Sequence, residues 1–211
     1  MADNYLEKRE EALRSAGRTV LRRNTPSLDT LLLKNRSHRA YDTTYQVSYR
    51  QLETIVSVNN KIPCSKNGQT LRFKLLTPEA GGRGFSRFMR LGAYLPELHL
   101  PTPGTEPQAF IIICSTVPES PSVDIDLGIA LQSMALKSVE IGLNALIIRA
   151  FDRAAVKSEL ELVLEPLAVL AIGKGTDKIA LKEVSADADL RYYREAGVHY
   201  VPKIKIEDLL L

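Results

Sequence analysis

A basic segment at residues 34–41 has the residue types that bind a phosphate group. Arg36 and Arg39 flank Ser37, directly after a predicted helix. Two guanidinium groups and a hydroxyl can present charge-assisted donors to the oxygens of one phosphate. The same residues also suit a solvated basic loop without a ligand. Taken alone, the segment favours the solvated loop.

A second segment, residues 63–69, combines small and polar residues immediately before a predicted strand. It reads Pro-Cys-Ser-Lys-Asn-Gly-Gln. Small residues let a backbone approach a ligand closely, and Asn67 and Gln69 offer both donors and acceptors. A plain turn between a helix and a strand is the simpler interpretation of this segment alone.

Other kinds of catalytic chemistry find little support in the sequence. No Gly-x-Ser-x-Gly elbow is present, and Cys64 has no neighbour that would activate its thiol. Residues 173–176 and 81–84 lack the glycine spacing and the flanking elements of phosphate and dinucleotide loops. The histidines lie too far apart in the sequence to indicate a metal site; they are His38, His99 and His199. We therefore predict no metal site and no serine or cysteine nucleophile.

Composition narrows the class of protein. The chain has 211 residues, 45% hydrophobic and 25% charged, which is typical of a globular protein and excludes wholesale disorder. Lys and Arg number 28 and Asp and Glu 25, so the net charge of +3 does not indicate a nucleic-acid partner. Two cysteines can form neither a disulfide framework nor a four-thiolate metal site.

The sequence also bears on location in the cell. The first residues are acidic and polar, where a signal peptide needs an apolar run. No window approaches the roughly 20 apolar residues of a membrane span. We expect a soluble, cytoplasmic protein without membrane or nucleic-acid partners.

Apolar patterns predict the elements that position the two polar segments. Residues 1–25 are expected to form an N-terminal helical extension, with a helix over 4–23, and residues 26–211 a single domain. The last alternating run, residues 201–206, is expected to be an edge strand. A helix is expected to start within residues 25–29 and to include residues 31–33. Further helices are expected near 48–60, 124–142 and 154–162, and strands at 71–76, 110–114, 145–148 and 168–172. Helices that alternate with apolar strands favour an α/β or α+β fold.

The order of the segments is more specific than any one of them. A basic Arg-Ser-x-Arg-x-aromatic run, a helix and the 63–69 segment are followed by the apolar helix at 124–132. The strand and turn at 147–152 come next, then residues 170–174, and the ending runs from Tyr192 to Lys203. Over roughly residues 30–205, this order resembles the FMN-dependent nitroreductase family.

The resemblance implies a fold and an assembly. The fold would be α+β, a nitroreductase-like three-layer sandwich with a mixed, mainly antiparallel central sheet and helices on both faces. The protein would be an intertwined homodimer with two FMN sites at the subunit interface. Its C-terminal tail would cross to the partner subunit.

Carried over position by position, the resemblance also implies the residues that bind FMN. The phosphate and the pyrimidine edge would be held by Arg36, Ser37 and Arg39. The isoalloxazine would be approached from the other subunit by Pro63, Cys64, Ser65 and Asn67. The flavin N5 region would lie beside the backbone of Arg149 and Ala150, and Lys174 would add a phosphate contact.

The implied activity is that of a flavin oxidoreductase. NAD(P)H would deliver hydride to the flavin N5 and leave, and a nitroaromatic, a quinone or a similar small acceptor would then take the electrons, a ping-pong scheme. No protein acid or base is required, because the cofactor carries the redox chemistry. The protein would supply position and charge.

Some positions depart from the family pattern. Asn35 stands where arginine is frequent, Cys64 where serine is usual, and Arg149-Ala150 where Glu-Gly is frequent. Two alternatives therefore stay open. The first is a flavin-binding or flavin-processing protein of the same fold without NAD(P)H turnover. The second is a dimeric interaction module without enzymatic activity.

Overall fold

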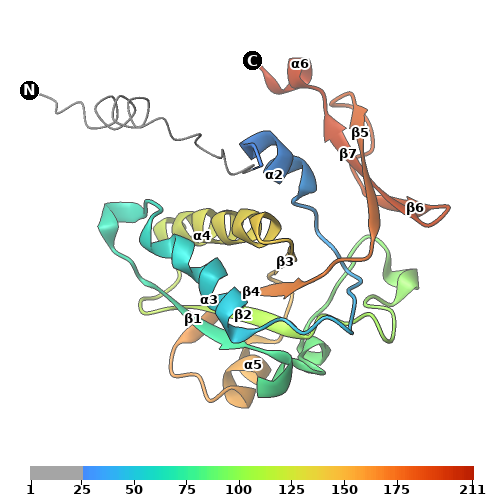
Figure 1. The fold of residues 1–211 in the computed structure, drawn as a ribbon. Coiled ribbons are helices and arrows are strands. Elements are labelled where there is room, and N and C mark those ends of the chain that lie inside the picture. The colour runs from blue at the N-terminus through green and yellow to red at the C-terminus, as the bar shows by residue number, and fades with distance from the viewer. Residues whose placement is uncertain (1–25) are drawn as a thin grey trace, which may run out of the picture.

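The computed structural model describes residues 26–211, so the helix expected at residues 4–23 lies outside the described residues. Helices and strands alternate along the chain (Figure 1). The α-helices are α2 (Leu28–Lys34), α3 (Tyr49–Val56), α4 (Pro121–Glu140), α5 (Arg153–Glu159) and α6 (Ile206–Leu209). The strands are β1 (Leu71–Leu76), β2 (Ala109–Ser115), β3 (Asn144–Ile148), β4 (Glu165–Gly173), β5 (Lys178–Val184), β6 (Tyr193–Glu195) and β7 (Val198–Ile204).

The main sheet contains the four strands that the sequence predicts. Their order is β1-β2-β4-β3, and each neighbouring pair is antiparallel. β2 is buried along its whole length because its residues are apolar on both faces. The resemblance predicts a mixed central sheet. This prediction is wrong, because every neighbouring pair of strands in the main sheet is antiparallel. The α+β class is confirmed.

Helices pack on both faces of the main sheet. Ile111 and Ile113 belong to the cluster that includes α3 and α4 residues. Phe110 and Ile112 belong to a second cluster, which includes α5 and Phe85. Because side chains alternate along a strand, β2 contributes to both clusters at once. Figure 1 shows α4 and α3 on one side of this sheet and α5 on the other.

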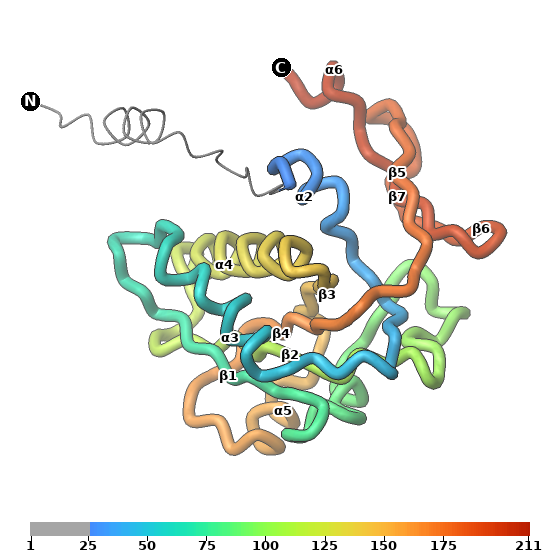
Figure 2. The backbone as a smooth tube through the Cα atoms, in the orientation of Figure 1, coloured from blue at the N-terminus to red at the C-terminus, as the bar shows by residue number. Residues whose placement is uncertain are grey.

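β5, β6 and β7 form a second sheet, which we call the arm (residues 178–204). Its order is β5-β7-β6, with β5 parallel and β6 antiparallel to β7. Figures 1 and 2 show the arm beside the main body rather than within its sheet. The sequence predicts an edge strand at residues 201–206, and this prediction is wrong. β7 is the central strand of the arm because both of its edges pair within the same chain.

Local signals explain where the helices start. Ser48 and Gln51 form a complete capping box before α3. α4 begins at Pro121 rather than near Asp124, because Ser120 caps it and proline suits its first turn. Ile125 of α4 is 63% exposed, so one side of this helix is uncovered in the single chain. Among the described helices, none combines the length and the apolar run needed to cross a membrane.

Candidate functional site

The basic segment after α2 lines a cavity of about 450 Å³, which we call the basic cavity. It is lined by Arg36, Ser37 and Arg39 of this segment together with His199 and Lys203 of β7. Among residues 26–211, no aspartate or glutamate lines this cavity. Three cations without a lining carboxylate make the cavity suited to an anion.

Arg36 is held so that part of its guanidinium stays available. Its Nη2 donates to the carbonyl oxygen of Leu32 at 2.6 Å. Its Nε is buried and has no hydrogen-bond partner among residues 26–211. Burial lowers the pKa of Arg36 from its ordinary value, because the charged form is desolvated. A buried guanidinium donor without an acceptor is costly, so an anionic ligand would stabilise it.

Asp177, a residue that sequence reasoning missed, fixes the backbone of the basic segment. Its Oδ2 accepts from the backbone nitrogens of Arg39 at 2.6 Å and of Ala40 at 3.0 Å. Its Oδ1 accepts from Arg194 of β6 at 2.5 Å. The Asp177 side chain is only 6% exposed. One buried carboxylate therefore ties the basic segment to the arm.

Arg39 contacts the arm through two aromatic side chains. Its guanidinium carbon lies 4.6 Å from the Tyr192 ring centroid, and its Nη1 lies 3.3 Å from Nε2 of His199. A guanidinium only donates, so Nε2 of His199 is the acceptor and the ring proton lies on Nδ1. Burial, then Arg39 and Arg194, lower the pKa of His199 to about 4. His199 is therefore neutral at physiological pH.

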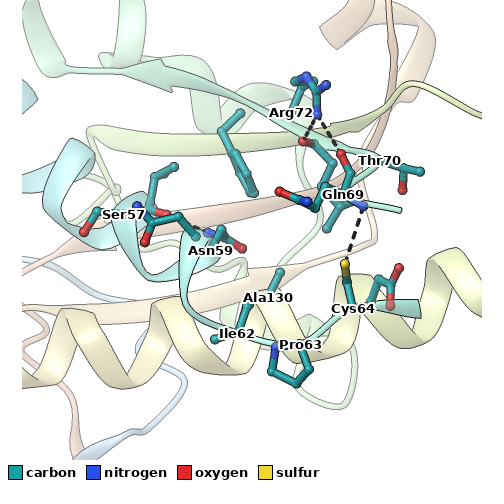
Figure 3. A pocket seen from close by; sticks show the side chains of 14 residues that line it. Ser57, Asn59, Ile62, Pro63, Cys64, Gln69, Thr70, Arg72 and Ala130 are labelled. Atoms are coloured by element: carbon teal, nitrogen blue, oxygen red, sulfur yellow. Dashed lines mark hydrogen bonds between the residues drawn. The ribbon is translucent and has the colours of Figure 1, made fainter. Parts of the chain in front are cut away.

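Residues 63–69 line a second cavity of about 340 Å³, which we call the loop cavity (Figure 3). Pro63 and Cys64 contribute to its wall, and the backbone nitrogen of Gln69 donates to Sγ of Cys64 at 3.4 Å. The backbone nitrogen of Ser65 donates to Oδ1 of Asp126 on α4 at 2.7 Å. The 63–69 segment is thus anchored to α4.

The turn after β3 lines a third cavity of about 510 Å³ with residues 87–90. Arg149 and Ala150 form part of this wall. The Arg149 guanidinium pairs with Glu119 at 2.5 Å and with Asp124 at 2.9 Å. The hydrogen bonds that Arg149 donates to Asp124 and to Glu119 raise the pKa of its guanidinium. The cation is therefore held at the start of α4.

Lys174 lies apart from all three cavities. Its Nζ is 4.5 Å from the Tyr45 ring centroid, and the side chain is exposed. The flanking glycines have a packing role, because a Cβ at Gly173 would lie 2.7 Å from Tyr41 and one at Gly175 would lie 2.2 Å from His38. The glycines around Lys174 therefore serve close packing at the end of β4.

Solved structures identify the architecture, although no protein-family model and no curated protein matches the chain. A nitroreductase family protein from Clostridium difficile is 23% identical, with a TM-score of 0.54 over 69% of this chain and 83% of that one. A nitroreductase family protein from Streptococcus pneumoniae is 13% identical, with a TM-score of 0.59 over 73% and 93%. An FMN-dependent nitroreductase from another Clostridium difficile strain is 18% identical, with a TM-score of 0.55 over 70% and 87%.

The chain has the nitroreductase fold. Within this fold, the structure brings only some of the predicted residues together. Arg36, Ser37 and Arg39 share the basic cavity, and Pro63 and Cys64 share the loop cavity. Ser65 and Asn67 belong to the same loop but are not among the residues that line it.

The remaining predicted residues lie elsewhere in the nitroreductase fold. Arg149 and Ala150 line the third cavity, and Lys174 lines none of the three. The single chain thus distributes the predicted flavin residues over separate cavities. Lys203 and His199 were missed because their place beside Arg39 depends on the pairing of β7, which no local pattern reveals. Across residues 26–211, no three His, Cys, Asp or Glu side chains gather as metal ligands would.

Proposed function

We propose that the protein is an FMN-dependent oxidoreductase that takes hydride from NAD(P)H and passes electrons to a nitroaromatic, a quinone or a similar small acceptor. The observation that carries this proposal is the basic cavity, where Arg36 has a buried donor without a partner among residues 26–211. The nitroreductase fold supports it, since one compared protein of this fold is FMN-dependent by name.

The basic cavity fits the phosphate end of FMN. Arg36, Ser37 and Arg39 would bind the phosphate and reach the pyrimidine edge, and Lys203 would add a third cation. An arginine fork matches phosphate geometry, and each charge-assisted hydrogen bond is worth about 1.5–3 kcal/mol. Lys174 holds its cation over Tyr45 instead, so we assign its predicted phosphate contact to Lys203.

The remaining contacts would come from the other two cavities. Pro63, Cys64, Ser65 and Asn67 would approach the isoalloxazine from the partner subunit, and the backbone of residues 149–150 would lie beside N5. When bound, FMN supplies the redox chemistry, so no protein acid or base is needed. The chain's own residues bind, orient and neutralise charge. Since Arg149 is paired with Glu119 and Asp124, its guanidinium is drawn away from that backbone.

A homodimer would unite cavities that one chain keeps apart. Several apolar side chains that a single chain leaves exposed support this assembly, and they lie on α2, α4, β3 and α6. They include Leu33 at 65%, Ile125 at 63%, Ile147 at 42% and Leu209 at 60% exposure. Pairing of two chains would cover these groups, with the helices of each chain in the layers of an intertwined sandwich.

The activity is tested by steady-state oxidation of NADH and NADPH by the purified protein, with menadione or a nitroaromatic as acceptor. We expect turnover that depends on both the donor and the acceptor, with parallel-line kinetics typical of a ping-pong scheme. A protein that holds FMN but oxidises neither donor would be a flavin-binding or flavin-processing protein. A protein that binds no flavin would instead fit the interaction module.

A further inference from the structure

Asp177 is a buried carboxylate that adjoins the basic cavity without lining it. Its side chain is 6% exposed, and the cavity wall does not include it. Oδ2 accepts from the backbone nitrogens of Arg39 and Ala40 at 2.6 and 3.0 Å, and Oδ1 accepts from Nη2 of Arg194 at 2.5 Å. Nδ1 of His38 lies 3.9 Å from Oδ2. The carboxylate thus finds its partners within the protein, and its effect on a ligand must pass through them.

The two backbone nitrogens depend on Asp177 alone. Within the described residues, no other acceptor reaches the nitrogen of Arg39 or of Ala40. Both residues are partly buried. A backbone donor that loses its acceptor at such a place is costly, so removal of the carboxylate would let this part of the basic segment leave its position.

The same carboxylate leaves the guanidinium of Arg39 unpaired. Among residues 26–211, Asp177 forms its ion pairs with Arg194 and His38 and none with this guanidinium. Nη1 of Arg39 donates to the carbonyl oxygen of Ser37 at 3.1 Å and lies 3.3 Å from Nε2 of His199. Nε and Nη2 of Arg39 make no hydrogen bond in the described part of the chain. These donors are therefore available to a ligand in the cavity that Arg39 lines.

Charge and position predict opposite effects of Asp177 on an anionic ligand. A carboxylate beside an anion site repels a phosphate, so its removal would strengthen phosphate binding if Asp177 acted through charge alone. If Asp177 acts by holding Arg39, its removal weakens phosphate binding, because a guanidinium that must first be ordered binds less tightly. A neutral side chain that keeps the acceptor oxygen separates the two effects.

We propose that Asp177 is a positioning residue of the phosphate site, and that its bonds to the backbone of residues 39–40 hold the Arg39 guanidinium where it meets the phosphate of the ligand. This inference rests on the proposed function and deepens it, because it assigns the preference for a phosphorylated flavin to a residue outside the cavity wall. Asp177 fixes Arg39 from the backbone side, and Tyr192 and His199 fix the side chain from the arm.

The test compares FMN with riboflavin, which has the same ring system and lacks the phosphate. Fluorescence titration gives the ratio of the two affinities for the full-length wild type, Asp177→Ala and Asp177→Asn. The preference for FMN should fall about 10-fold or more in Asp177→Ala, with riboflavin binding unchanged, because the guanidinium contact with the phosphate is lost. Asp177→Asn is equally neutral but keeps an oxygen for the two backbone nitrogens, so its preference should equal or exceed that of the wild type.

Two results would overturn the inference and leave the proposed function intact. They are a preference that stays the same or rises in Asp177→Ala, and a preference that falls as far in Asp177→Asn as in Asp177→Ala. A wild type that binds neither flavin would contradict the proposed function, and inorganic pyrophosphate then replaces FMN as the probe. Pyrophosphate binding should weaken in Asp177→Ala and persist in Asp177→Asn. No binding to the wild type, or equal binding to all three proteins, would overturn the inference.

If Asp177→Ala does not fold, hydrogen exchange in the wild type decides. The backbone amides of Arg39 and Ala40 should exchange more slowly with saturating FMN than with saturating riboflavin, because phosphate binding and the placement of this segment stabilise each other. Equal exchange rates with the two flavins would overturn the inference.

Discussion

Arg36 and Arg39 line the same cavity but are held in different ways. The Arg36 guanidinium donates one hydrogen bond to the carbonyl oxygen of Leu32 in α2, and its buried Nε has no partner within the described part of the chain. Arg39 is fixed at its backbone by Asp177 and at its side chain by His199 and Tyr192. The two arginines therefore approach the cavity with donors in reserve and with little freedom to move, which is how a phosphate site is preorganised.

Replacement of either arginine by alanine should weaken FMN binding. Loss of one charge-assisted hydrogen bond costs about 1.5–3 kcal/mol, which corresponds to a roughly 10- to 150-fold higher dissociation constant. Fluorescence titration of FMN with Arg36→Ala and Arg39→Ala measures this change. Arg50→Ala, on the exposed side of α3, should bind FMN as the wild type does. Unchanged affinity in both cavity variants would show that the phosphate binds elsewhere.

His199 should make the stability of the fold depend on pH. Its pKa in the folded state is about 4, below the ordinary value near 6.5, so the unfolded chain takes up the proton first as pH falls. The stabilising contribution is thus complete above about pH 6.5 and is lost toward pH 4. It amounts to about 3 kcal/mol at most.

Urea unfolding between pH 4.5 and 7.5 measures this contribution. The free energy of unfolding should fall more steeply with acid in the wild type than in His199→Gln. His99→Asn changes an exposed histidine and should follow the wild type. Identical pH dependence in the wild type and His199→Gln would contradict the role given to this buried ring.

Sequence reasoning found the residues of the basic cavity that are neighbours in the chain. Arg36, Ser37 and Arg39 form one run, so their types and spacing are visible in the sequence. Asp177, His199 and Lys203 reach the same place only through the pairing of the arm. Such contacts, with sequence separations of more than a hundred residues, leave no local pattern.

β7 is the element on which the arm depends. It lies between β5 and β6, and it carries both His199 and Lys203. Lys205 continues the pairing, since its backbone nitrogen donates to the carbonyl oxygen of Val184 at 3.0 Å. Loss of β7 would leave β5 and β6 without any partner strand.

Truncation after Tyr200 should therefore give insoluble or flavin-free protein. It removes half of β7 together with Lys203, so the arm and the basic cavity are both lost. Truncation after Lys205 retains β7 and Lys203 and removes only the last six residues, so it should give more soluble and more flavin-bound protein than truncation after Tyr200 does. Expression yield and flavin content measure the difference. A soluble protein that binds FMN after truncation at Tyr200 would refute the role of the arm.

At the scale of elements, buried strands and capped helices were predictable from the sequence. β2 and β4 are apolar runs bounded by polar turns, and the capping box of α3 is a four-residue signal. The place of β7 was not predictable, because alternation along a strand shows that one face is covered but not which strands pair with it. The sequence prediction starts α4 at Asp124, which is too late. The helix starts at Pro121, because Ser120 caps it and the proline suits its first turn.

The whole molecule distributes its candidate flavin contacts in a way that suits two chains. The basic cavity meets α4 near Gln132, and the loop cavity meets it at Asp126 and Ala130. Residues 126 and 132 are six positions apart, so they lie about 9 Å apart along the helix and on different sides of it. This placement on different sides of α4 suits a flavin that contacts the basic cavity of one chain and the 63–69 segment of its partner.

Dimerisation and FMN binding should be coupled. If each flavin contacts both chains, FMN stabilises the dimer, and dilution lowers the apparent affinity for FMN. Light scattering of the eluting protein, recorded with and without FMN, should show a dimer that persists to lower concentration with FMN. A monomer that binds FMN with an affinity independent of protein concentration would contradict the shared site.

The central claim is that this nitroreductase fold binds FMN, and the absorbance spectrum of the purified full chain tests it most directly. The protein should be yellow, or become yellow on addition of FMN and gel filtration. The cofactor released by heat should have the mass of FMN, at about one molecule per chain. A colourless protein that neither retains added FMN nor releases a flavin would contradict the account.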